Sequence, residues 1–96
     1  MRPSEALAKN LDAVRAIIAR YPVANPRVFG SVARGDDHEG SDVDLLVDST
    51  SETSLFDLAG LKLDLGDLLG ASVDVVTSKS LRQFILENAI RDARPL

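Results

Sequence analysis

The chain has 96 residues, of which 45% are hydrophobic and 4% aromatic, and its formal net charge is -4 with no cysteine. This length predicts one domain, residues 1–96, while the acidic balance argues against direct nucleic-acid binding and the missing cysteines exclude disulfides and thiolate metal sites. The sequence shows neither the apolar stretch of a signal peptide nor a membrane span, so we expect no membrane contact and a cytoplasmic location.

The N-terminal segment carries an apolar stripe at helical spacing. After Ser4, a favourable N-cap residue, the stripe consists of Leu7, Leu11, Val14 and Ile18. This pattern predicts one helix over residues 4–20. Pro22 and Pro26 then interrupt it.

A short strand and a polar turn follow the prolines. Residues 27–30 are rich in strand-favouring side chains, which predicts a strand that ends in a turn at Gly30 and Ser31. Residues 31–34 fit one helical turn. The charged, glycine-bounded residues 35–40 are predicted to form a loop.

The segment after this loop alternates between acidic and apolar side chains, which predicts a strand from Ser41 onward. Asp42, Asp44 and Leu46 fall on one face of that strand, and the opposite face is aliphatic. Residues two apart on a strand lie about 6 to 7 Å apart. The two carboxylates are therefore suitably spaced to share a hard cation such as Mg²⁺.

Leucines dominate the next segment. They recur every three or four residues over residues 55–68, which predicts a helix that Gly70 ends. Phe56, Leu63 and Leu69 fall on other sides of this helix. The apolar residues therefore fit either a buried core or, in part, a surface for a partner protein.

A strand and a helix complete the chain. Residues 73–76 are β-branched apart from Asp74, which predicts a short strand. Ser78 or Ser80 is expected to cap a last helix that Pro95 ends.

The acids and the glycine-serine turn together suggest a site for a metal and a phosphate. Asp74 lies on the only other acid-bearing strand and completes a three-carboxylate cluster if the two strands are neighbours. Gly30 lets a phosphate approach the backbone, and the amides and hydroxyl at Ser31 favour an anion. Three carboxylates alone would repel a triphosphate, so the arrangement requires a metal between them.

The remaining charges of the loop allow simpler interpretations. Arg34 is equally compatible with a phosphate contact and with a salt bridge to Asp36 or Asp37. We interpret Asp36, Asp37 and Glu39 as solvated charges. His38, the one histidine, is expected to be exposed and not to bind metal.

These motifs resemble the nucleotidyltransferase superfamily of DNA polymerase beta, specifically its minimal members, which are often encoded beside a HEPN-type partner. The matching residues are Gly30, Ser31, Ala33, Arg34, Gly35, Ser41, Asp42, Asp44, Leu45, Val73, Asp74 and Val76. The resemblance extends over nearly the whole chain and is strongest over residues 29–48. It implies a nucleotidyltransferase fold of the α/β (α+β) class, with a short mixed β-sheet and helices packed on one face.

The resemblance also implies roles for individual residues. The catalytic acids, which also hold two Mg²⁺ ions, would be Asp42, Asp44 and Asp74. The nucleotide-binding residues would be Gly30, Ser31, Arg34 and Ser41. The implied reaction is Mg²⁺-dependent attack of a hydroxyl on the α-phosphate of ATP, with transfer of AMP and release of pyrophosphate.

The minimal family further implies the acceptor, a tyrosine on a HEPN-type toxin that the modification silences. The chain would then be an antitoxin and part of a hetero-oligomer. Two alternatives stay open. One is a non-catalytic antitoxin that neutralises its partner by contact, and the other is nucleotidyl transfer to a small molecule.

Overall fold

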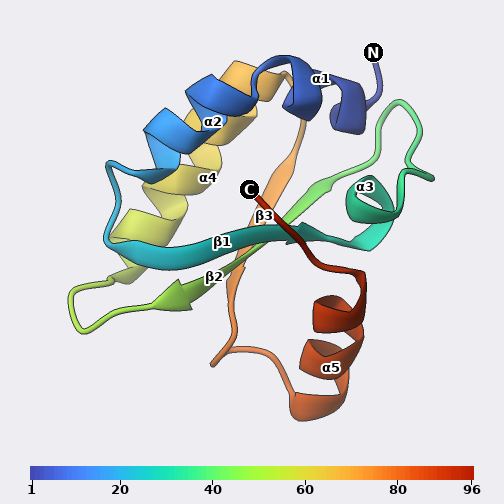
Figure 1. The fold of residues 1–96 in the computed structure, drawn as a ribbon. Coiled ribbons are helices and arrows are strands. Elements are labelled where there is room, and N and C mark those ends of the chain that lie inside the picture. The colour runs from blue at the N-terminus through green and yellow to red at the C-terminus, as the bar shows by residue number, and fades with distance from the viewer.

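The computed structural model describes residues 1–96, apart from the side chain of Phe84, and contains a four-stranded mixed sheet with helices around it (Figure 1). The elements in chain order are α1 (Pro3–Lys9), α2 (Leu11–Ile18), β1 (Val23–Phe29), α3 (Gly30–Arg34), β2 (Val43–Ser49), α4 (Leu55–Leu69), β3 (Val73–Thr77), α5 (Gln83–Asp92) and β4 (Arg94–Pro95). The strand order is β3-β2-β1-β4. Strand β2 is parallel to β3 and antiparallel to β1, which also pairs with β4 in antiparallel orientation. The predicted mixed α/β fold is confirmed.

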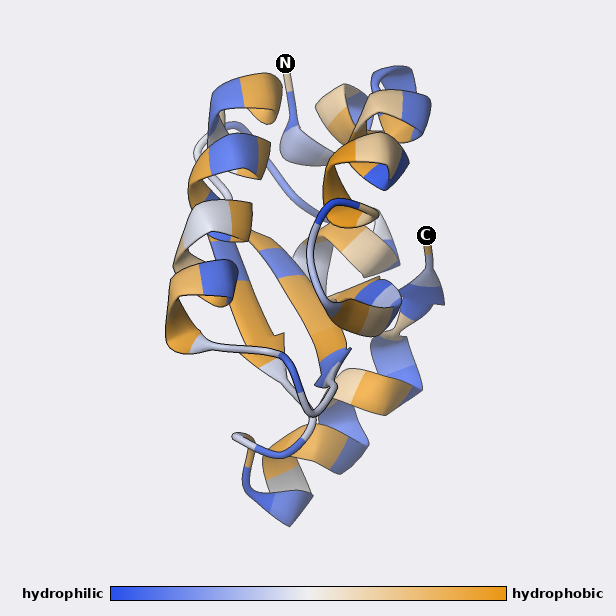
Figure 2. Cartoon of the chain, turned by 90° about the vertical axis from the view of Figure 1, so that its left-hand side faces the viewer, coloured by the Kyte–Doolittle hydropathy of each residue, from blue (hydrophilic) through white to orange (hydrophobic). Residues whose placement is uncertain are grey.

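The aliphatic face of β2 lies in the middle of the core. Val43, Leu45 and Val47 are buried and belong to one hydrophobic cluster with residues of α2 and α4. Burial of one such side chain contributes about 1.5 to 3 kcal/mol. Figure 2 shows mainly hydrophobic strands in the middle of the molecule, with helices of alternating hydropathy beside them. Helix α5 packs against β1 and α3.

Helix α4 begins and ends where the sequence predicts. The Ser54 hydroxyl accepts a hydrogen bond from the Asp57 amide at 3.2 Å, and the Asp57 carboxylate accepts one from the Ser54 amide at 2.9 Å. Such a reciprocal cap satisfies two backbone donors at the helix start. Gly70 ends the helix in the left-handed region, at φ 63°. With 15 residues α4 is the longest described helix, and none of the described helices is long and apolar enough to cross a membrane.

The interpretation of the leucine helix as part of the core is confirmed for one side of it, and the partner surface stays a prediction. Leu61 and Leu65 are buried in the core. Phe56 and Leu63 remain exposed at 89% and 66%. Leu69, which was expected among the outward residues, is instead buried.

The N-terminal segment forms two helices, so the prediction of one helix over residues 4–20 was wrong. Asn10 interrupts it with φ -114° and ψ 21°, and its side-chain amide donates to the Ala6 carbonyl at 2.8 Å. An asparagine side chain competes in this way with the backbone for helical carbonyls. The first helix also starts earlier than expected, with Pro3 in its first turn, where a missing N–H costs nothing.

Strand β1 is longer than predicted because a bulge accommodates Pro26. The strand starts at Val23, Asn25 has φ 52°, and the register against β2 shifts around this point. Proline is tolerated within sheets mainly at edges and bulges. Its carbonyl still accepts a hydrogen bond from the Leu96 amide at 3.1 Å, next to the short β4 that the sequence does not reveal.

The predicted caps of the last helix were also wrong. The Ser80 hydroxyl donates to the Thr77 carbonyl at 2.9 Å in a turn, and the Ser78 hydroxyl donates to the Asp48 carboxylate. Helix α5 begins only after Arg82, its N-cap. Pro95 lies in β4 and is not what ends the helix.

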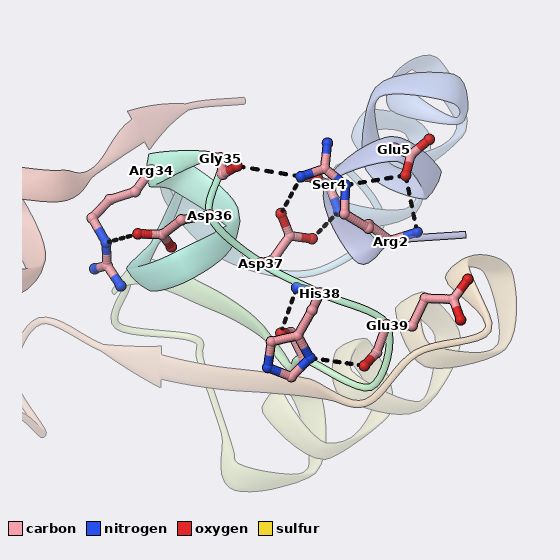
Figure 3. A network of polar contacts seen from close by, with 10 residues as sticks. Arg2, Ser4, Glu5, Arg34, Gly35, Asp36, Asp37, His38 and Glu39 are labelled. Carbon is pink, nitrogen blue, oxygen red and sulfur yellow. Dashed lines mark hydrogen bonds and ion pairs between the residues drawn. The ribbon is translucent and has the colours of Figure 1, made fainter.

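A buried acid fixes the loop between α3 and β2 to α1, so the interpretation of Asp37 as a solvated charge was wrong. The Asp37 side chain is 0% exposed, its Oδ2 accepts a hydrogen bond from the Ser4 amide at 2.9 Å, and the Arg2 guanidinium lies 3.9 Å from its Oδ1 (Figure 3). Burial by itself would raise the pKa of Asp37. The hydrogen bonds, with that from Ser4 the largest, and the Arg2 charge outweigh burial and hold this pKa below its ordinary value.

We predict that Asp37→Asn, which keeps the shape but removes the charge, destabilises the fold in a pH-dependent way. Because the folded-state pKa lies below the unfolded value of about 3.9, the carboxylate stabilises the protein above that pH and loses this effect as pH falls through the folded-state pKa. Urea unfolding at pH 7 should show a loss of about 1 kcal/mol in the free energy of unfolding.

The difference from the wild-type protein should shrink steadily below about pH 4. Glu52→Gln, at an exposed loop acid, is the matched control and should show no such pH-dependent difference. An equal deficit for Asp37→Asn at neutral and acidic pH would contradict the role of the charge.

Candidate functional site

Two acids face each other across the parallel pair of strands. Asp44 of β2 is the register partner of Asp74 of β3, so the two side chains leave the same face of the sheet. Asp42 lies directly before the first residue of β2 and is exposed. The condition on which the predicted cluster depends, that the two acid-bearing strands are neighbours, is therefore met. Like charges at paired positions destabilise a sheet, so this pairing has no structural benefit of its own.

The pKa of Asp44 is raised above its ordinary value. Burial is the main cause that raises the pKa of Asp44, followed by the charges of Asp74 and Asp42, while the Arg34 charge acts in the opposite direction. The carboxylates thus form a concentration of negative charge that a bound cation would relieve.

The turn after β1 brings the backbone against the same carboxylate. Phe29 is the register partner of Asp44, so Gly30 follows directly beside it. Gly30 has φ 72°, and a Cβ at this position would lie 2.6 Å from Asp44 Oδ2. The backbone conformation therefore favours glycine, and a larger residue would have to displace the Asp44 carboxylate. Ser31 comes next, in the first turn of α3.

Arg34 at the end of α3 forms two ion pairs. Its Nε donates to Asp36 at 3.2 Å, and its Nη1 donates to Asp92 of α5 at 2.8 Å. The interpretation as a salt bridge is thus confirmed for Asp36, and Asp92 is a partner that the sequence does not suggest. The predicted phosphate contact of Arg34 stays a prediction.

Ser41 closes the loop that leads into β2. Its hydroxyl accepts a hydrogen bond from the His38 amide, and its own amide donates to the His38 carbonyl, both at 3.0 Å. The His38 ring lies against the Glu39 carbonyl at 2.8 Å in an exposed position (Figure 3). Ser41 therefore fixes the backbone one residue before Asp42.

The donor set at this site fits a hard divalent cation. Within the part of the chain that the structure describes, no three His, Cys, Asp or Glu side chains are grouped closely enough to hold a metal ion by themselves. The predicted cluster of three carboxylates is therefore not formed by the protein alone. Magnesium, however, is usually bound by one or two carboxylates together with substrate phosphates and water. The half-buried Asp44, with its raised pKa and its partner Asp74, offers carboxylate oxygens whose mutual repulsion such an ion would offset.

The family model of the nucleotidyltransferase domain matches residues 11–96. The chain belongs to the nucleotidyltransferase family. The match includes the glycine-serine turn, both strands that carry the acids, and α5. Gly30 and Asp44 therefore both lie within the matched nucleotidyltransferase domain.

Curated relatives support the same assignment. The chain is 36% identical over 77 residues to a Methanocaldococcus jannaschii protein named "Putative protein adenylyltransferase MJ0435", covering 80% of this chain and 83% of the relative. It is 41% identical over 73 residues to "Protein adenylyltransferase MntA" of Thermococcus cleftensis, covering 76% and 74%.

Solved structures share the fold. One described as a "putative minimal nucleotidyltransferase" has a TM-score of 0.87 and 44% identity and covers 97% of this chain and 95% of that chain. A toxin-antitoxin structure with AMP-PNP has a TM-score of 0.78 at 19% identity, covering 90% and 71%. A complex of a tri-AMPylated Shewanella oneidensis HEPN toxin with its MNT antitoxin has a TM-score of 0.65 at 17% identity, covering 97% and 70%.

We predict that Gly30→Ala destabilises this nucleotidyltransferase domain more than Gly35→Ala does. Both glycines have positive φ, 72° and 77°, so alanine strains the backbone at either position by about 1 to 2 kcal/mol. Only at Gly30 would the added Cβ meet another group, the Asp44 carboxylate, whereas nothing lies within 4 Å at Gly35.

Urea unfolding should therefore show a loss for Gly30→Ala that exceeds that of Gly35→Ala by about 1 kcal/mol or more. Equal losses in the free energy of unfolding would show that a Cβ at position 30 does not clash with the Asp44 carboxylate.

Proposed function

We propose that this chain is a Mg²⁺-dependent protein adenylyltransferase that transfers AMP from ATP to a tyrosine of a HEPN-type toxin, and thereby acts as an antitoxin. The observation that carries the proposal is the in-register pair of Asp44 and Asp74 beside the Gly30 turn. The names of the relatives and the toxin-antitoxin complexes among the structural neighbours support the choice of acceptor.

The proposed reaction assigns one task to each group of residues. Asp42, Asp44 and Asp74 would hold two Mg²⁺ ions, which supply charge neutralisation for the phosphates when bound. The amides and hydroxyl at Gly30 and Ser31 bind the phosphates, because a glycine turn lets an anion approach the backbone.

The chemical step then needs a base and an open position for the acceptor. The tyrosine oxygen attacks the α-phosphorus, the bond to pyrophosphate breaks, and the hydroxyl proton passes to Asp74. Asp74 is exposed, so an acceptor can reach it from solvent. Arg34 and Ser41 are the further nucleotide-binding residues of this proposal. Most of the rate enhancement in such a reaction comes from positioning and charge stabilisation.

The acceptor comes from a separate protein in this proposal, which makes the functional unit a hetero-oligomer. ATP as the donor fits a cytoplasmic site of action. The described core includes residues of α1, α2, α3, α4 and the sheet, and these buried residues pack within the chain. A partner protein would therefore supply the tyrosine and the contacts that position it.

A second candidate function is supported by the outer side of α4. Leu55, Phe56 and Leu63 are exposed at 83%, 89% and 66%. Exposed apolar residues that gather on one element are typical of protein-interaction surfaces. A non-catalytic antitoxin could neutralise its partner by contact through these residues.

The two candidates differ in how they depend on the carboxylates. We predict that incubation with α-labelled ATP, Mg²⁺ and a HEPN-type partner labels the partner, and that Asp42→Ala or Asp44→Ala reduces the labelling by about a hundredfold or more. Glu52→Ala, at an exposed acid outside the site, is the control and should label normally.

Full neutralisation of the partner by Asp42→Ala and Asp44→Ala, without any label, would instead support the contact mechanism. Label on a small hydroxylated compound in the absence of a protein partner would support transfer to a small molecule.

A further inference from the structure

A cleft between α3 and α5 adjoins the glycine turn. Its volume is about 190 Å³, and its lining includes Gly30, Arg34, Ile85 and Asp92. The volume is smaller than the roughly 300 to 1,000 Å³ of typical ligand pockets. It therefore suits a part of a nucleotide whose remainder extends toward the carboxylates of β2 and β3.

Arg34 is the cationic side chain that this cleft presents. Its side chain is 47% exposed, and its charge lowers the pKa of Asp44, against the larger effects of burial and the neighbouring acids. The hydrogen bonds that Arg34 donates to Asp92 and then to Asp36 are the main causes that raise the pKa of Arg34. These two bonds use two of the five N–H groups of the guanidinium.

The two acids that pair with Arg34 differ in how far they can restrain its side chain. Asp36 is two residues away on the same loop, so its ion pair moves with that loop. Asp92 comes from the last turn of α5, 58 residues later in the chain, and reaches Arg34 across the cleft. A long, half-exposed arginine samples many rotamers unless a second element restrains it. Asp92 supplies that restraint.

We propose that Asp92 is a positioning residue for nucleotide binding, which holds the Arg34 guanidinium beside the Gly30 turn so that its remaining N–H groups meet the phosphates of ATP. The inference rests on the proposed function, since it requires ATP at this site. A pre-oriented guanidinium loses less conformational freedom when it binds a phosphate, so the restraint increases affinity. The geometry thereby gives α5 a role in substrate binding.

The test is a double-mutant cycle on the dissociation constant of ATP, measured by calorimetry with Mg²⁺ and the full chain. Asp92→Ala should weaken ATP binding about three- to fivefold, and Arg34→Ala about tenfold. The double variant should bind ATP as Arg34→Ala does, because Asp92 acts only through Arg34. Glu87→Ala removes an exposed acid from the same helix without touching Arg34, and should leave the dissociation constant unchanged.

Unchanged or tighter binding by Asp92→Ala would overturn the positioning role, and tighter binding would mean that Asp92 competes with the phosphates for Arg34. An equal loss from Asp92→Ala in the wild-type and Arg34→Ala backgrounds would mean that Asp92 acts through the packing of α5. If the wild-type chain does not bind ATP at all, the proposed function itself fails, which thermal unfolding of the same sample distinguishes from a failure to fold.

Discussion

The parallel, in-register pairing of β2 and β3 is the constraint on which the rest of the site depends. It places Asp44 directly opposite Asp74, two like charges whose repulsion opposes folding. The aliphatic face of the same strand packs into the core, so β2 cannot shift by one residue without moving Val43, Leu45 and Val47 out of this core. Hydrophobic burial on one face of β2 thus offsets the repulsion between Asp44 and Asp74 on the other face.

Several contacts around this pair serve to hold the site in shape. The turn at Gly30 lies against Asp44 because a residue without a side chain follows β1 at this point. Asp37 anchors the loop before β2 to the start of α1, and the ion pair between Arg34 and Asp92 connects α3 to α5. The candidate site is therefore held by contacts that involve the N-terminal, middle and C-terminal parts of the chain.

Local patterns made much of this structure predictable. The alternation around Asp44, the helical leucine spacing and the glycine stop each depend on residues a few positions apart. The short motif around the glycine-serine turn is local in the same way. Long-range contacts were not predictable in this way. The burial of Asp37 depends on α1, and the role of Asp92 depends on a partner 58 residues earlier. The break at Asn10 was missed because its side chain competes for a carbonyl that a stripe pattern does not consider.

The central claim is that the paired carboxylates and the glycine turn together hold a metal-bound nucleotide. The test replaces Mg²⁺ with paramagnetic Mn²⁺, which is added together with AMP-PNP at a concentration below that of the protein. NMR spectra then show which backbone amide signals the bound Mn²⁺ broadens. The account predicts that the amides of Ser31, Asp44 and Asp74 broaden first, and that Asp44→Asn prevents this. Broadening that is spread evenly over the surface acids, or that persists unchanged in Asp44→Asn, would contradict it.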